Sequence, residues 1–226
     1  MTPIVTNKLT FFVSRDLGID AELLLTFDDQ PIAGMYKDYY PSAFAVRKFG
    51  ADGIYRADIT YRSQLAFTKV VVSHDVIQSA STEVAVQVEQ STTLTMKNQI
   101  FHFSDPKTDL SVPKNNIQCV NHAPCKEDIG LGFIEREGDE PKTALVWHGV
   151  EHGQTLNVEF VPRLRGYVNA CPYQLGSLLE GPIQSGRLFD QDLSTLDKHT
   201  TWVVTYDEPT GVFRIDEEIT SEVQHL

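Results

Sequence analysis

The chain has 226 residues, of which 41% are hydrophobic and 22% charged, and its formal net charge is -12. This composition can form a core and disfavours global disorder, and the length suits one large β-sandwich, so we expect a single domain over residues 1–226. The acidic surface repels phosphate groups, which makes nucleic acid and anionic membranes poor partners.

Alternating apolar residues predict strands along most of the chain. In the run 55–62, the side chains of Tyr55, Ala57, Ile59 and Tyr61 fall on one side and polar side chains on the other. This is the period of a half-buried strand. In chain order, the predicted strands cover residues 9–13, 21–27, 55–62, 65–72, 84–88, 93–103, 131–136, 143–148, 154–161, 202–206 and 212–215.

The succession of strands and short turns favours an all-β fold, an antiparallel two-sheet β-sandwich of the jelly-roll-like type. The run 65–72 is apolar on both faces, as expected of a strand buried between two layers. We expect one hairpin from 143–148 with 154–161, and another from 202–206 with 212–215.

Residues 171–200 interrupt the strand pattern. We expect a long loop here, with short helical turns at 175–179 and 190–196. Because the edges of a large sandwich need covering, this segment is a candidate to cross to a second copy, and we expect a homodimer.

The cysteines and the N-terminal segment bear on the cellular compartment. Cys119, Cys125 and Cys171 are an odd number, which fits free thiols in a reducing compartment. Residues 1–8 contain no basic stretch followed by an apolar run, and no window approaches ~18 continuous apolar residues. We therefore expect a cytoplasmic protein with neither secretory signal nor membrane span.

One histidine string matches a catalytic motif in spacing only. His148-Gly149-Val150-Glu151-His152 has the H-x-x-E-H spacing of the inverted zinc peptidases. That chemistry needs a helix, so that both histidines share a face, whereas the glycine and the strand-like flanks predict a polar turn. If the protein binds a metal, the candidate ligands are His122, His148 and His152.

Several aromatic residues lie where the strand pattern gives way to the long loop. With a few polar groups they suit a concave pocket for a flat organic ligand or a sugar ring, although each alone also suits ordinary core packing. The candidate ligand-binding residues are Trp147, His148, Tyr167, Asn169, Tyr173 and Trp202.

Residues 144–148 (ALVWH) and 167–173 (YVNACPY), with the few cysteines, carry a resemblance in style rather than in a motif. The chain resembles the leaderless β-sandwich proteins of mushroom fruiting bodies, in particular the pink chromoproteins of oyster mushrooms. The resemblance implies a fungal sandwich dimer that holds a small indole-derived pigment as its cofactor.

Three functions follow from these observations. The first is a non-enzymatic protein that holds a small, flat, aromatic molecule, such as a pigment, between its sheets or at a dimer seam. The alternative is a carbohydrate-binding lectin, in which an exposed aromatic ring packs on a sugar. The third is a metal-dependent enzyme that uses the histidine cluster. Phosphate-binding glycine loops are missing, and we expect no catalytic residues.

Overall fold

The structure is a computed structural model that describes residues 4–169 and 172–218. Every regular element in these two ranges is a strand, so the predicted all-β class is confirmed. No helix forms at 175–179 or 190–196, where short helical turns are expected; instead the chain makes single hydrogen-bonded turns at 174–177 and 192–195. The described residues contain no helix long and apolar enough to cross a membrane.

The strands form four hydrogen-bonded sheets, here numbered I to IV. Sheet I has the order β18-β17-β1-β5, built from β1 (Thr6–Val13), β5 (Tyr55–Arg62), β17 (His199–Asp207) and β18 (Val212–Glu217). Sheet II has the order β16-β15-β2-β4, built from β2 (Ala21–Thr26), β4 (Ala45–Phe49), β15 (Arg163–Val168) and β16 (Arg187–Asp192). Sheet III has the order β3-β13-β12-β6-β7, built from β3 (Tyr40–Pro41), β6 (Leu65–Ser73), β7 (Val76–Val86), β12 (Glu127–Phe133) and β13 (Lys142–Val150). Sheet IV has the order β10-β8-β11-β14 with β9 on β8, built from β8 (Gln90–Lys97), β9 (Ile100–Phe103), β10 (Lys107–Thr108), β11 (Asn116–Asn121) and β14 (Thr155–Glu159).

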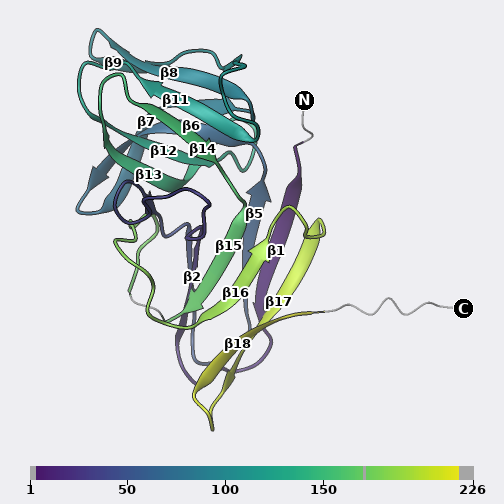
Figure 1. The fold of residues 1–226 in the computed structure, drawn as a ribbon. Helices are drawn as coiled ribbons and strands as arrows, with labels where there is room; N and C mark the ends of the chain where they lie inside the picture. The colour runs from purple at the N-terminus through teal and green to yellow at the C-terminus, as the bar shows by residue number, and fades with distance from the viewer. Residues whose placement is uncertain (1–3, 170–171, 219–226) are drawn as a thin grey trace, which may run out of the picture.

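The middle of the chain and its two ends occupy different parts of the molecule. Sheets III and IV are stacked in the upper part of Figure 1 and come mainly from residues 65–159. Sheets I and II lie below them and come from the segments on either side. One cluster of buried apolar side chains runs through all four sheets, with members such as Leu9, Leu23, Phe67 and Leu94.

The pairing of the strands differs from the expected two-sheet arrangement. Strands β13 and β14 were expected to form a hairpin, but β13 pairs with β12 and β3, and β14 pairs with β11. The turn between them therefore carries the chain from sheet III to sheet IV. The hairpin of β17 and β18 is confirmed, and β17 also pairs in parallel with β1.

The predicted strand 93–103 is a hairpin of β8 and β9. Asn98 and Gln99 turn the chain with φ of 50° and 64°. Asn adopts this left-handed conformation more readily than most residues, and two such residues in succession suit a tight hairpin. The apolar residues on both sides of this turn gave the sequence the pattern of one continuous strand.

The segment expected to be helical at 190–196 begins as part of β16, which pairs with β15. Phe189 is buried, with its ring 5.2 Å from Phe11 and 4.9 Å from Trp202. The neighbouring Asp190 forms ion pairs with Arg163 and Arg187. The burial of Phe189 and the ion pairs of Asp190, on opposite faces of the backbone, favour a strand here over the predicted helical turn.

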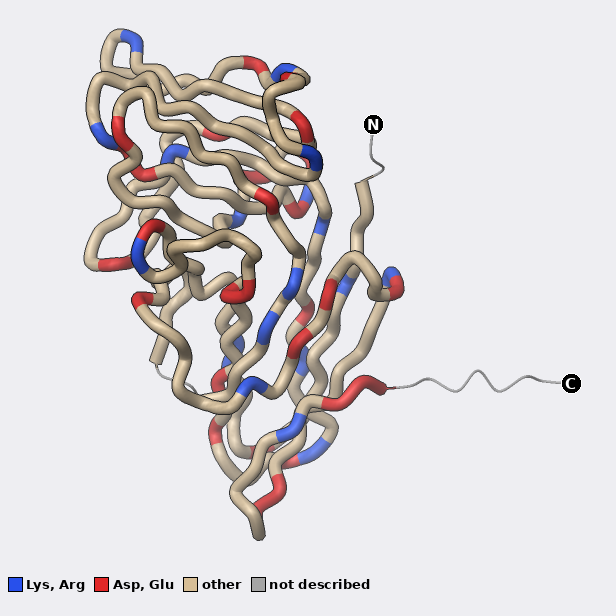
Figure 2. The backbone as a smooth tube through the Cα atoms, viewed as in Figure 1, with Lys and Arg blue, Asp and Glu red and all other residues tan. Residues whose placement is uncertain are grey.

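Charged residues are distributed over both pairs of sheets. Figure 2 shows acidic and basic segments interspersed along the chain, with an acidic stretch where β18 ends. Many of them face an opposite charge, such as Lys8 with Asp58, whose Nζ and Oδ2 atoms are 3.0 Å apart. The acidic excess is therefore not confined to one element.

Candidate functional site

Residues 172–186, here called the covering loop, pack on the outer faces of sheets II and III. On sheet II, Tyr173 and Ile183 pack against a small cluster that contains Leu24 and Tyr167. On sheet III, Leu178 packs against Val70 and Val146. These faces point away from the main core, so the loop buries apolar surface that water would otherwise reach.

Backbone hydrogen bonds hold the centre of the covering loop in place. The N–H of Leu178 donates to the carbonyl of Asp75 (2.7 Å), and the N–H of Leu179 donates to the carbonyl of Pro41 (2.8 Å). The N–H of Ala43 donates to the carbonyl of Ser177 (2.7 Å). These bonds fix the loop between strand β3 with the residues that follow it and the turn that joins β6 to β7.

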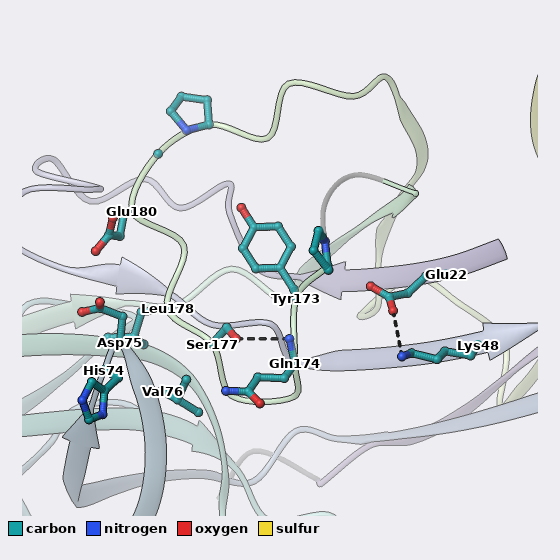
Figure 3. Close-up of a pocket in the computed structure, with 13 residues that line it drawn as sticks. Glu22, Lys48, His74, Asp75, Val76, Tyr173, Gln174, Ser177, Leu178 and Glu180 are labelled. Atoms are coloured by element: carbon teal, nitrogen blue, oxygen red, sulfur yellow. Dashed lines mark hydrogen bonds and ion pairs between the residues drawn. The ribbon is translucent and has the colours of Figure 1, made fainter. Parts of the chain in front are cut away.

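A cleft of about 670 Å³ lies beside this fixed segment. Sheet II contributes Glu22 and Lys48, which form an ion pair with 3.5 Å between Oε2 and Nζ. In Figure 3 the half-buried Tyr173 ring lies between this pair and Glu180. The turn from β6 to β7 contributes Asp75. The remaining lining residues are His74, Val76, Pro172, Gln174, Ser177, Leu178, Gly181 and Pro182.

The turn that carries Asp75 has an unusual backbone. His74 and Asp75 have φ of 50° and 58°, as in the tightest hairpin turns. Asp tolerates this conformation better than most residues. The carbonyl of Asp75 is held by Leu178, so the position of the turn at the rim of the cleft is fixed by the covering loop.

A cluster of hydrogen-bonded polar side chains lies next to Tyr167, the residue against which Tyr173 packs. The hydroxyl of Tyr167 donates to Oδ2 of Asp28 (2.7 Å), and Nη1 of Arg165 lies 3.8 Å from Oδ1 of Asp28. Arg165 also donates from Nη2 to Oδ2 of Asp29 (2.6 Å). These contacts join the end of β2 to β15 and hold the floor on which the covering loop packs.

Burial dominates the electrostatics of this floor. Desolvation raises the pKa of Asp28 above its usual range, even though the Tyr167 hydrogen bond and Arg165 both lower it. Desolvation, together with the charge of Asp28, raises the pKa of Tyr36 to about 12. The tyrosines are therefore neutral hydrogen-bonding groups at physiological pH.

The structure divides the predicted ligand-binding residues: Tyr167, Asn169 and Tyr173 lie at or beside the cleft, and the other three do not line it. Trp147 is 6% exposed and stacks on Tyr39, with ring centres 5.4 Å apart. Trp202 is 4% exposed, and its indole N–H donates to Thr200 (3.1 Å). Both tryptophans are core residues of different sheets, because their strands place them on inner faces. Tyr167 belongs to the buried floor.

The other predicted residues lie at the surface. Tyr173 lines the cleft. Asn169 accepts a hydrogen bond at Oδ1 from the N–H of Glu22 (2.7 Å) and therefore lies beside the cleft. His148 lies 3.2 Å from Asp128, measured from Nδ1 to Oδ1. Cys171 of the predicted free thiols lies outside the described residues, whereas Cys119 and Cys125 are free.

The predicted metal ligands do not assemble as a set of three. The rings of His122 and His152 are neighbours, with centres 5.8 Å apart, while His148 instead contacts Asp128 and Tyr40. In residues 4–169 and 172–218, no group of three or more His, Cys, Asp and Glu is arranged to hold a metal ion.

Four charged residues of the cleft are not among the site residues predicted from the sequence: Glu22, Lys48, Asp75 and Glu180. A signal existed for Asp75, since His74-Asp75 stands between two apolar runs, a pattern typical of a hairpin turn. Glu22 and Lys48 lie opposite each other on the paired strands β2 and β4, and the path of the covering loop brings Glu180 to the same cleft. Comparison of the chain with protein-family models, curated proteins and solved structures finds no match.

Proposed function

We propose that the cleft binds a neutral saccharide and that the protein is a non-enzymatic carbohydrate-binding protein. The observation that carries the proposal is the half-buried ring of Tyr173 among carboxylates from three different segments, Glu22, Asp75 and Glu180. A sugar ring presents the matching chemistry, with apolar C–H groups on its faces and hydroxyl groups around its edge.

The two kinds of lining group have separate roles. The Tyr173 ring offers a flat apolar surface on which a sugar packs. Carboxylates accept hydrogen bonds from sugar hydroxyls, and the amide of Gln174 both donates and accepts. The cleft of about 670 Å³ falls within the usual size of small-molecule sites.

The charge of the cleft favours a ligand without negative groups. Its three carboxylates face one lysine, Lys48, which is already paired with Glu22. Asp75 and Glu180 therefore repel phosphates and carboxylic acids. A neutral polyhydroxylated ligand fits this charge balance, and an acidic saccharide does not.

A flat aromatic ligand, such as an indole-derived pigment, is the second candidate. A smaller groove of about 220 Å³, lined in part by Phe44, Ile77, Pro141 and Leu175, offers a mainly apolar surface. A pigment in this groove would give the natively purified protein an absorption band at visible wavelengths. A colourless protein with no small molecule released on denaturation contradicts this candidate.

A glycan array probed with the purified chain tests the saccharide proposal. We expect binding to neutral glycans, weakened at least about tenfold by Asp75→Asn or Glu180→Gln, since each removes a charged hydrogen-bond acceptor worth about 1.5–3 kcal/mol. Asn suits the backbone of residue 75, so Asp75→Asn changes the charge without straining the turn.

Glu89→Gln is the matched control. Glu89 is exposed, has a positive φ of 63° and does not line the cleft, so its loss of charge should leave glycan binding unchanged. An array without neutral glycan binding contradicts the proposal. Equal weakening by the control and by the cleft variants contradicts it as well.

A further inference from the structure

Two histidines from separate turns meet at one end of the upper pair of sheets. His122 directly follows β11, and His152 lies in the turn that carries the chain from β13 to β14. Both residues are exposed, and their ring centres are 5.8 Å apart with an angle of 36° between the ring planes. None of the residues that line the saccharide cleft takes part.

A buried asparagine fixes the two turns against each other. The side chain of Asn121 donates from Nδ2 to the carbonyls of Val150 (2.7 Å) and Cys125 (3.1 Å). Its Oδ1 accepts from the N–H of Ala123 (2.9 Å). Because Asn121 is fully buried, these bonds are shielded from water, and the backbone around both histidines is pre-organised.

Two further contacts tie the same turns together. The N–H of Asn121 donates to the carbonyl of Gln154 (3.0 Å), and the N–H of Gly153 donates to the carbonyl of Asn121 (2.6 Å). At the rim, Nζ of Lys126 lies 2.7 Å from Oε1 of Glu151. The separation of the histidine backbones is therefore set by these backbone bonds and by the Asn121 side chain, and does not depend on the two imidazole rings.

The hydrogen bond of His152 determines which of its ring nitrogens is available. Nδ1 lies 2.8 Å from the carbonyl oxygen of Ala123. A carbonyl only accepts, so Nδ1 carries the proton, and in the neutral ring Nε2 keeps its lone pair. Histidines that bind metals usually donate their other N–H to such a partner, which orients the ring.

We propose that His122 and His152 form a two-histidine site for a divalent first-row transition metal ion, such as Zn²⁺. Metal–nitrogen bonds of about 2.0–2.1 Å in tetrahedral geometry place two ring centres roughly 5–6 Å apart, which matches the observed separation. Imidazole nitrogen favours Zn²⁺, Cu²⁺ or Ni²⁺ over Mg²⁺ and Ca²⁺, which prefer oxygen.

The described residues supply no third ligand, so water or an external group completes the coordination shell. The site is therefore open and binds more weakly than a closed structural zinc site with four protein ligands. This inference is independent of the saccharide proposal, because the two sites share no residue.

Calorimetric titration of the chelator-treated full chain with Zn²⁺ tests the proposal. We expect one equivalent to bind, with the affinity lowered at least about tenfold, or about 1.4 kcal/mol, by His122→Gln or by His152→Gln. His122→Gln is the cleaner variant, since the His152 side chain also bonds to Ala123. Circular dichroism confirms that each variant is folded before titration.

His148→Gln is the matched control, because His148 is also exposed but pairs with Asp128. It should bind Zn²⁺ as the unchanged chain does. The proposal is overturned if the unchanged chain binds no Zn²⁺, if both folded variants of the pair bind normally, or if His148→Gln weakens binding equally.

Discussion

Strand β5 in sheet I and strand β2 in sheet II show two kinds of outer face. Along β5, buried Ala57 and Ile59 alternate with exposed Arg56 and Asp58, because the outer face meets water. The centre of β2, residues 23–25, is buried without interruption, because the covering loop packs on its outer face. A continuous apolar run therefore marks a covered face, and the covering loop that buries this face also lines the cleft.

The same contrast appears in two carboxyl groups. Burial raises the pKa of Asp28 on the covered side. Partial burial also acts to raise the pKa of Asp58, but hydrogen bonds from Thr10, Lys8 and Arg56 outweigh it and hold that pKa at about 2. The covered face thus favours the neutral form of its carboxyl group, and the open face favours the charged form.

Removal of the main anchor of the covering loop should have the largest effect on stability. Leu178 is 4% exposed and packs between Val70 and Val146, so Leu178→Ala leaves a cavity. We expect the free energy of unfolding to fall by about 2–5 kcal/mol in urea denaturation. Leu175→Ala is the control in the same loop, since Leu175 is 58% exposed and its truncation should change stability by less than about 0.5 kcal/mol. Equal losses in both variants would show that the loop is not anchored as described.

The pH dependence of Asp28 provides the second test. A folded-state pKa raised above the ordinary 3.8 means that the folded protein binds this proton more readily than the unfolded chain. The contribution of Asp28 to stability is therefore complete below its ordinary pKa and falls as the pH rises through the raised value. We expect the unfolding free energy of the unchanged chain, minus that of Asp28→Asn, to increase on acidification. A difference that decreases on acidification contradicts the dominance of burial.

A substitution of Asp58 on the open face should have the smallest effect on stability. Its pH dependence should have the opposite sign to that of Asp28. Asp58→Asn removes ion pairs with Lys8 and Arg56, but its side chain is 39% exposed, so solvent screens them. We expect a loss of at most about 1 kcal/mol near neutral pH. Because the folded pKa is lowered, this stabilisation is present above pH 3.8 and disappears as the pH falls through about 2. Thermal unfolding of both proteins across this pH range measures it.

The class of the fold was predictable from the sequence, but the pairing of its strands was not. Alternation located β5 and the β17–β18 hairpin correctly, because one face of each is in contact with water. It could not assign β13 and β14 to different sheets, since the turn between them has the same composition as a hairpin turn. Sheet membership depends on long-range contacts that a local pattern does not contain.

The candidate site was predictable only in part. Tyr173 was predictable because an aromatic ring in a loop is a common ligand contact, and it lines the cleft. Trp147 and Trp202 are also aromatic, but strand periodicity places both in the core. Glu22 and Glu180 meet only through the path of the covering loop, so their juxtaposition has no signature in the sequence.

Titration of the ¹⁵N-labelled chain with the strongest glycan from the array shows where the saccharide binds. We expect the amide shifts to concentrate at residues 74–76 and 172–182, around Tyr173, and Asp75→Asn to reduce them. Shifts confined to the groove beside Phe44, or to the turns that carry His122 and His152, would contradict the assignment of the cleft as the saccharide site.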